Sequence, residues 1–352
     1  PAPHCIHQDA HKLEPGCVAT FRGADDPDIR RWWSARDVWQ GSAADQFSGT
    51  EAEAVDELER LLGDAVGGRM LADVPLGAFL SGGIDSSTVV ALMQARSPRP
   101  VKTFCIGFHE GDYNEADHAR DVAAHLGTDH TELMLTPQDL LDVVPDIPRY
   151  WDEPFADSSQ IPTYCVSRLA RQAVTVSLSG DGGDELFIGY NRYFWLGWWN
   201  VLRRIPAPAR RGAARLLRAL PPQAFRMLGR NGPKLRWRLD MLGMRHFADF
   251  YRYFLSHFKH PEDLVLGGRE PVTALMDPAN DLGCDPQRQM AFWDVLGYLP
   301  GDILTKVDRA SMAVSLEARV PLLDHRVVEF AARIPTAMHM QGGTGKRLLR
   351  RV

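Results

Sequence analysis

The chain has 352 residues, which is enough for about two domains. Hydrophobic residues make up 45% of it and charged residues 24%, an ordinary balance for a globular protein. The formal charge of −5 provides no general attraction to nucleic acid, and no apolar run approaches the roughly 20 residues needed to cross a bilayer. We therefore expect neither a nucleic-acid partner nor a membrane partner.

The cysteines indicate a reducing compartment. There are five of them, an odd number, and no two form a C-x-x-C pair. This pattern argues against a disulfide framework and against a zinc site. No signal peptide is visible, so the sequence predicts a cytoplasmic protein. The cysteines are Cys5, Cys17, Cys105, Cys165 and Cys284.

The first 50 residues have little periodicity. Residues 1–36 are broken by Gly and Pro, with a turn at Leu13–Gly16 and a short strand at Cys17–Phe21. The stretch Ala35–Gly49 is polar and contains Gly and Ser, so we place a linker at residues 37–50. Apolar residues then recur at helical spacing and predict a helix over Glu51–Leu71.

Strands and helices alternate from Pro75 onward. Such alternation predicts an α/β fold, in which a parallel sheet has helices on both faces. Gly127 is expected to end one of the helices, because Gly readily adopts the left-handed conformation found there. The expected strands are Pro75–Leu80, Val101–Phe108, His130–Leu135 and Val174–Ser179, and the expected helices are Ser86–Arg96, Asn114–Leu126, Pro137–Val144 and Thr163–Ala173.

The alternation stops at about Tyr190, and the remaining residues predict helices broken by Pro and Gly. The aromatic stretch Tyr193–Leu202 is too short to span a membrane and predicts a helix that packs against the protein. The stretch Arg203–Arg218 is rich in Arg. A basic cluster can contact nucleic acid, but it is more often a solvated helical face, which is the interpretation we prefer.

The loop between the first of these strands and its helix has the composition of an anion site. It reads SGGIDSS and joins a buried strand to a helix N-terminus, where backbone N–H groups and the helix dipole favour negative charge. The loop lacks both the Walker A pattern and the dinucleotide-binding pattern G-x-G-x-x-G. Its glycines allow a phosphate to approach closely, and its serines add hydroxyl donors. These residues are Ser81, Gly82, Gly83, Ser86 and Ser87.

The same loop contains a carboxylate, Asp85, among the phosphate donors. A carboxylate repels phosphate unless a cation lies between them, so the loop implies Mg²⁺. A turn capped by Ser86 or Ser87 without any ligand is the simpler alternative.

A second strand, turn and helix start lies at Leu178–Glu185 and contains three carboxylates and three glycines. So much negative charge in one turn is costly unless a cation compensates it. A Mg-nucleotide or an amine-bearing substrate would do so, whereas the helix dipole explains one carboxylate better than three. Leu80, Ile106 and Ser179 lie at or near strand ends, where ligands of open parallel sheets bind, so we expect them to flank one crevice.

These motifs carry a family resemblance. The loop SGGIDSS resembles the SGGxDS signature of the pyrophosphate-loop ATP pyrophosphatases, in which the substrate attacks the α-phosphate of ATP. The stretch SGDGGDELFIGYNRY resembles the asparagine synthetases and the related β-lactam synthetases, and so do residues 152–171, 302–325 and 345–350. The resemblance runs from about Glu51 to the end of the chain. Four such motifs in this order are highly specific.

The resemblance implies a role for each matching residue. Asp181 corresponds to the position tied to forming the aspartyl-adenylate and receiving ammonia, where many relatives have Glu. Lys346 matches a lysine near the reacting phosphate, although a basic surface cluster is its simpler interpretation. Lys306, Asp308 and Arg309 are interpreted as structural. ATP is expected at Leu80, Ser81, Gly82, Gly83, Asp85, Ser86, Ser87, Ile106, Ser179 and Gly180, and Mg²⁺ at Asp85 and Asp184.

The implied reaction is the amidation of aspartate through β-aspartyl-AMP, with AMP and pyrophosphate released. Ammonia would come from glutamine through a glutaminase domain that begins with a Cys nucleophile. Because this chain begins with Pro1 and its residues 12–21 resemble the end of such a domain, we expect that domain to lie outside the chain. We expect residues 1–36 to be its tail, 51–190 the ATP-pyrophosphatase core and 191–352 a helical, C-terminally incomplete part. The sequence does not decide whether the protein forms a homodimer.

Three alternatives remain at this point. One is a β-lactam-forming or other amide-forming synthetase that adenylates a different carboxylate with the same ATP residues. Another is a tRNA-modifying enzyme of the same loop class, which only the basic cluster Arg203–Arg218 supports. The third is a nucleotide-binding regulatory module without catalysis, which the presence of Asp85, Asp181 and Lys346 argues against.

Overall fold

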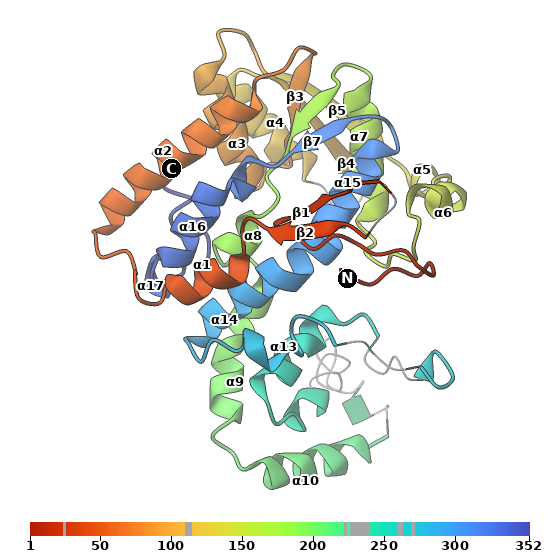
Figure 1. The fold of residues 1–352 in the computed structure, drawn as a ribbon, viewed down its shortest axis with the longest axis vertical. Helices are drawn as coiled ribbons and strands as arrows, with labels where there is room; N and C mark the ends of the chain where they lie inside the picture. The colour runs from red at the N-terminus through yellow and green to blue at the C-terminus, as the bar shows by residue number, and fades with distance from the viewer. Residues whose placement is uncertain (24–25, 110–114, 222–223, 226–238, 259–262, 269–271) are drawn as a thin grey trace. The chain divides into compact units, whose positions relative to one another are not determined.

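The computed structural model describes all of the chain except residues 24–25, 110–114, 222–223, 226–238, 259–262 and 269–271 (Figure 1). The chain folds as two compact units. The first contains residues 1–189 and 291–352, and the second contains residues 190–290. The chain thus leaves the first unit after Gly189 and returns to it at Ala291.

The first unit is built on a five-stranded parallel sheet with the strand order β5-β4-β3-β6-β7 (Figure 1). This confirms the predicted α/β fold. The central strands are short and almost wholly buried, which explains why they appear in the sequence as apolar runs. The strands are β3 Leu76–Phe79, β4 Lys102–Phe108, β5 Asp129–Leu135, β6 Val176–Leu178 and β7 Glu317–Arg319.

Helices surround this sheet. Helix α7 packs on β3 and β4, α4 packs on β4 and β5, and α15 packs on both α7 and β7. Gly127 ends α4 in the left-handed conformation, with φ of 69°, as predicted. The helices of this unit are α1 Ala35–Gly41, α2 Glu51–Arg69, α3 Ile84–Arg96, α4 Ala116–Leu126, α5 Pro137–Leu141, α6 Ile147–Tyr150, α7 Gln160–Arg171, α8 Gly183–Leu186, α15 Leu304–Met312, α16 His325–Arg333 and α17 Thr336–His339.

Shorter elements complete the unit. Strands β1 (Cys17–Thr20) and β2 (Asp28–Arg31) form a separate antiparallel pair. Single 3₁₀ turns cover Val144–Asp146 and Pro321–Leu323, and a π-helical stretch covers Asp294–Ile303. Helix α14 (Pro286–Trp293) runs along the chain from the second unit into the first.

The structure differs from the sequence-based expectations in two places, and a third expectation falls partly outside the described residues. Helix α1 occupies part of the stretch expected to be a linker. Strand β7 lies in a region where only helices were expected, and it pairs in parallel with β6. Helix α4 begins at Ala116, whereas the predicted start at Asn114 lies outside the described residues.

The second unit is helical in its described parts. An aromatic cluster fills its core, and the rings of Trp199 and Phe250 lie 4.8 Å apart. This confirms that Tyr193–Leu202 packs inside the protein, since Tyr193 is fully buried. The described elements are a 3₁₀ stretch Asn191–Trp195, α9 Leu196–Leu202, α10 Ala207–Arg218, α13 Phe247–Leu255 and a 3₁₀ turn Pro278–Asn280.

The basic cluster lies mostly on α10, and one of its arginines is structural. Arg210 is buried and donates hydrogen bonds to the carbonyl oxygens of Ile205, Leu242 and Met244. Arg218 forms an exposed ion pair with Asp240. Within the described residues, no helix combines the length and the apolar character needed to cross a membrane.

Candidate active site

The N-terminus of α3 is the open end of a strand-loop-helix unit. Gly83 is its N-cap residue, and no side chain caps the helix there. Because the first N–H groups of a helix have no partner within the helix, they remain available to a ligand. Gly82 has φ of 73°, and a Cβ on it would lie 2.7 Å from the backbone of Ala119. The loop therefore needs Gly at this position to pack against α4.

Hydroxyl groups fix the shape of this loop. The Oγ atoms of Ser81 and Ser86 lie 3.0 Å apart. The Ser86 hydroxyl also donates to the Gly83 carbonyl oxygen at 3.2 Å, and the Gly83 N–H donates to Ser81 Oγ at 3.3 Å. The Ser87 hydroxyl is buried and has no hydrogen-bond partner in the described part of the chain. The predicted serine donors are thus brought together, and two of them hold the loop itself.

The loop after β6 lies directly against the loop before α3. A Cβ on Gly180 would lie 2.6 Å from Ser86 N, and one on Gly183 would lie 2.3 Å from Asp85 Cγ. Both glycines are therefore required by the close approach of the two loops. The contact brings the two chemical stretches of the sequence side by side.

The strand-end residues occupy three neighbouring strands. Leu80 follows β3 and donates its N–H to the Phe104 carbonyl oxygen in β4 at 2.9 Å, and its side chain is buried. Ser179 follows β6 and donates its N–H to the Arg319 carbonyl oxygen in β7 at 2.9 Å. Ile106 lies within β4 and also packs on the apolar cluster around Trp151. The three residues thus lie near one edge of the sheet.

A lysine bridges the carboxylates of the two loops. Lys346 Nζ lies 2.6 Å from Asp85 Oδ2 and 2.7 Å from Asp184 Oδ1. The side chains of Lys346 and Asp85 are each only 14% exposed, so the pair is largely shielded from water. The structure therefore places Lys346 inside the cluster rather than on a basic surface.

Strained backbone positions this lysine. Lys346 has φ of 56° and Ile188 has φ of 58°, a region that costs a residue with a side chain about 1–3 kcal/mol. The Lys346 N–H donates to the Phe187 carbonyl oxygen at 2.9 Å. A Cβ on Gly189 would lie 2.1 Å from Lys346 Cε, and one on Gly345 would lie 2.0 Å from the Ile188 carbonyl oxygen. The two segments are thus pressed together where the lysine enters the cluster.

Burial governs the electrostatics of the site. It raises the pKa of Asp85 to about 6, against the opposing effect of the Lys346 ammonium. Burial also raises the pKa of Asp181. The neighbouring Ser179 and the positive charge of Lys306 oppose this rise. Burial lowers the pKa of Lys346, but Asp85 and Asp184 outweigh it and the pKa is raised overall. The cluster is therefore short of positive charge.

This donor set fits Mg²⁺. Asp85 Oδ1 is buried and lacks a hydrogen-bond partner among the described residues, so one carboxylate oxygen is left for a cation. No cluster of three or more His, Cys, Asp or Glu side chains suited to a metal occurs in the described residues. Mg²⁺ does not need one, because it commonly binds through one or two carboxylates together with phosphate oxygens and water.

A second buried lysine contacts the loop before α7. Lys306 Nζ lies 3.0 Å from Asp157 Oδ2 and 2.9 Å from Ser159 Oγ. By contrast, the ion pairs of Arg309 are long and exposed, with Asp152 at 3.7 Å and with Asp308 at 3.8 Å. The sequence analysis missed the link from Lys306 to Asp157, since 149 positions separate the two residues.

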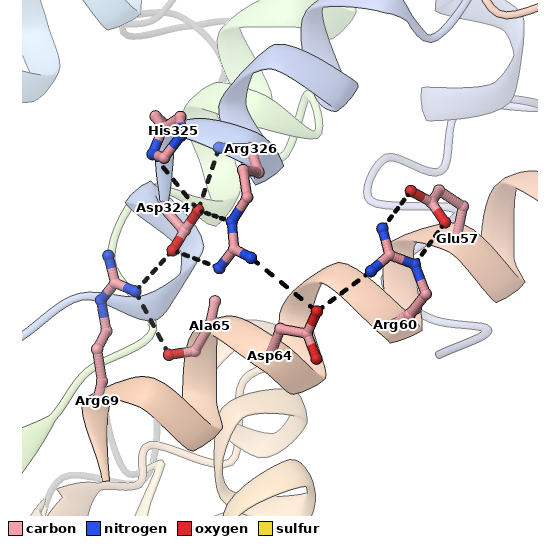
Figure 2. A network of polar contacts seen from close by, with 8 residues as sticks. All are labelled: Glu57, Arg60, Asp64, Ala65, Arg69, Asp324, His325 and Arg326. Carbon is pink, nitrogen blue, oxygen red and sulfur yellow. Dashed lines mark hydrogen bonds and ion pairs between the residues drawn. The ribbon is translucent and has the colours of Figure 1, made fainter. Parts of the chain in front are cut away.

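A polar network joins the start of α16 to helix α2 (Figure 2). Asp324 caps α16 and contacts both Arg69 and Arg326, and Arg326 continues the network toward Asp64 on α2. The 3₁₀ turn just before Asp324 touches the second loop, because a Cβ on Gly182 would lie 2.5 Å from Leu323 Cδ2. The network thus ties the turn that supports this loop to helix α2.

Comparisons with known proteins agree with this site. Residues 57–352 match the family model described as asparagine synthase. A protein of Mycobacterium bovis, provisionally named a glutamine-hydrolyzing asparagine synthetase, is 36% identical over 100% of this chain and 53% of its own length. Glutamine-hydrolyzing asparagine synthetase 1 of Bacillus subtilis is 32% identical over 100% of this chain and 54% of its own length.

Two further facts follow from these comparisons. The chain spans about half the length of the curated relatives it matches. The matched region contains the open N-terminus of α3, the loop after β6 and Lys346. The chain therefore belongs to the asparagine synthase family.

Proposed function

We propose that this chain carries the synthetase half of a glutamine-hydrolysing asparagine synthetase. In this reaction the β-carboxylate of aspartate attacks the α-phosphate of ATP, pyrophosphate leaves, and ammonia then displaces AMP from β-aspartyl-AMP. The observation that carries the proposal is the uncapped N-terminus of α3 beside Asp85, Asp184 and Lys346. An open helix start next to a lysine and two carboxylates is suited to a phosphate chain with its cation.

ATP would lie across both loops. The phosphates would contact the N–H groups at the start of α3 and the loop of Ser81, Gly82 and Gly83, with Ser86 and Ser87 beside them. The adenosine part would lie at the strand ends of Leu80, Ile106, Ser179 and Gly180. Lys346 would stabilise the negative charge that develops on the α-phosphate and on the departing pyrophosphate. The protein thus contributes position and charge.

Asp85 and Asp184 would hold Mg²⁺. The ion, when bound, would neutralise the phosphate oxygens that face the two carboxylates. The free Oδ1 of Asp85 supports this assignment. Burial that raises the pKa of Asp181 suits a group that accepts a proton from the attacking ammonia, which is the role proposed for this residue.

Two expectations remain predictions. Ammonia is supplied by a glutaminase domain outside this chain, and the protein is cytoplasmic. The first agrees with the chain spanning 53% of a similar protein.

The test uses the full-length protein with ATP, Mg²⁺, aspartate and ammonia, and follows pyrophosphate and AMP. We expect pyrophosphate release that depends on aspartate, and a loss of about 100-fold in Asp85→Asn, because a proposed ligand of the Mg²⁺ ion at the phosphates is removed. Asp64→Asn is the matched control, since this half-exposed residue lies on α2. Release only with another carboxylic acid would move the function to a different amide-forming synthetase, and no release with any acid would contradict the proposal.

A further inference from the structure

Lys306 is a buried cation with a free hydrogen-bond donor. Its side chain is 12% exposed, and its ammonium contacts Asp157 and Ser159. An ammonium has three N–H donors, and these contacts use two of them. Among the described residues, the third donor has no partner. A charged donor that is buried but not fully used can bind a ligand oxygen.

Lys306 lies on a helix whose neighbours lead to the loop after β6, which is the second loop of the site. Helix α15, which carries Lys306, packs on α7, and Ser159 is the N-cap residue of α7. The positive charge of Lys306 opposes the burial of Asp181, so the two side chains act on each other electrostatically. Lys346 acts in the same way on Asp85. Lys346 contacts Asp85 and Asp184, whereas Lys306 contacts Asp157 and Ser159, so the two lysines hold different segments. Helix α15 also packs on β7, the strand whose Arg319 carbonyl oxygen accepts the Ser179 N–H at the start of the second loop.

The segment that holds this lysine contains a second polar group with an unpaired atom, among the described residues. Gln160 follows Ser159 and is 7% exposed. Its amide nitrogen donates to the Phe155 carbonyl oxygen at 3.2 Å, but its Oε1 is buried with no hydrogen bond in the described part of the chain. An unsatisfied buried acceptor destabilises the protein, and a bound polar ligand that donates to it would remove that cost. The stretch 157–160 thus contains one unpaired acceptor, Gln160 Oε1, as well as the two residues that contact Lys306, Asp157 and Ser159.

We propose that Lys306 determines acceptor specificity by binding a second carboxylate of the acceptor, the one that does not react with ATP. Asp157 and Ser159 orient the ammonium, and its third N–H donates to the carboxylate oxygen. The site thereby selects a dicarboxylic acceptor over a monocarboxylic one. The inference rests on the proposed function, because it assigns one end of the same acceptor.

The experiment uses the full-length protein and compares wild type with Lys306→Met and Lys306→Arg. Initial rates of pyrophosphate release are measured at saturating MgATP and ammonia, with L-aspartate or with β-alanine, which lacks the second carboxylate. In Lys306→Met we expect KM for aspartate to rise about 10- to 100-fold, the effect of losing one hydrogen bond to a charged group. KM for ATP should stay near the wild-type value, while the melting temperature should fall because Asp157 loses its partner. Lys306→Arg, which keeps the charge, should recover part of the loss.

The preference for aspartate over β-alanine is the decisive quantity. If Lys306 binds the second carboxylate, this preference collapses in Lys306→Met while the rate with β-alanine is little changed. If Lys306 only joins α15 to the loop before α7, the rates with aspartate and with β-alanine should fall equally and KM for ATP should rise as well. That result would overturn the proposal. An unchanged KM for aspartate would overturn it as well. Failure of the proposed function is distinguishable, since wild type itself would then release no pyrophosphate with any acid.

Discussion

Helices α2 and α3 begin in opposite ways. Thr50 and Glu53 close the start of α2 with a capping box, in which each side chain accepts a hydrogen bond from the other residue's backbone N–H. Helix α3 begins after Gly83 with no side-chain cap. The acidic residue in its first turn, Asp85, contacts Lys346 instead. A helix start closed by its own side chains is structural, whereas one left open is available to a ligand.

Helix α16 provides a second closed start for comparison. Asp324 accepts a hydrogen bond from the Arg326 N–H at 3.1 Å and also contacts the guanidinium groups of Arg69 and Arg326 (Figure 2). Its carboxylate thus serves both as a cap and as the centre of an ion-pair network. Closing α3 in a similar way should remove its function, and opening α16 or α2 should cost only stability.

The largest effect is expected from closing the start of α3 with Gly83→Asp. Gly83 has φ of −72° and ψ of 159°, which any residue adopts, and a Cβ there would lie 3.2 Å from Ser81 Oγ. The new carboxylate would accept the free N–H groups and repel phosphate, so we expect MgATP affinity to fall about 100-fold. The free energy of unfolding should change by only a few tenths of a kcal/mol, because Gly is itself an acceptable N-cap.

Calorimetric titration with MgATP and urea unfolding measure these two quantities. Gly83→Ala is the matched control, since it adds the Cβ but no acceptor, and it should retain most of the ATP affinity. Unchanged ATP binding by Gly83→Asp would show that the phosphates do not bind at this helix start.

An intermediate effect, on stability and its pH dependence, is expected from Asp324→Asn. The hydrogen bond from Arg326, with further help from Arg69, holds the pKa of Asp324 well below its usual value. The unfolded chain therefore binds this proton more readily than the folded protein, and the charged carboxylate stabilises the fold. We expect the substitution to cost about 2 kcal/mol at pH 7.

The pH profile tests the cause of this loss. The difference between wild type and Asp324→Asn should be constant above about pH 5 and shrink as the pH falls below the unfolded-state pKa of about 3.9, since the unfolded wild-type chain then takes up a proton that the folded protein does not. Asp64→Asn, with its 50% exposed side chain, should cost less than about 1 kcal/mol. Urea unfolding over this pH range measures both. A difference that does not change with pH would mean that the ion pairs are not its source.

The smallest effect is expected from opening α2 with Thr50→Ala. Loss of the hydroxyl acceptor should lower the free energy of unfolding by about 1 kcal/mol, as for other N-caps. Thr50→Ser keeps the oxygen and should stay within a few tenths of a kcal/mol of wild type. ATP affinity should be the same in all three proteins. A change in ATP affinity would argue that the closed start of α2 also contributes to the site.

The sequence predicted the elements of the sheet whose signals are local. Strands β3 and β6 are short apolar runs, and α2 and α3 follow from helical spacing or from a motif within a few residues of each helix start. Strand β7 was missed because its residues, Glu317–Arg319, include two charged side chains and form no apolar run. It becomes a strand only by pairing with β6.

The same division applies to the site. The residues of the two loops could be proposed from the sequence, because a glycine- and serine-rich turn before a helix is itself typical of an anion site. Lys346 could be named only by resemblance, and its contact with Asp85 spans 261 positions along the chain. The tertiary structure alone decides that Lys346 bridges Asp85 and Asp184 and that Lys306 joins Asp157. Such pairs depend on where distant segments pack, and a short-range sequence pattern has no information about that.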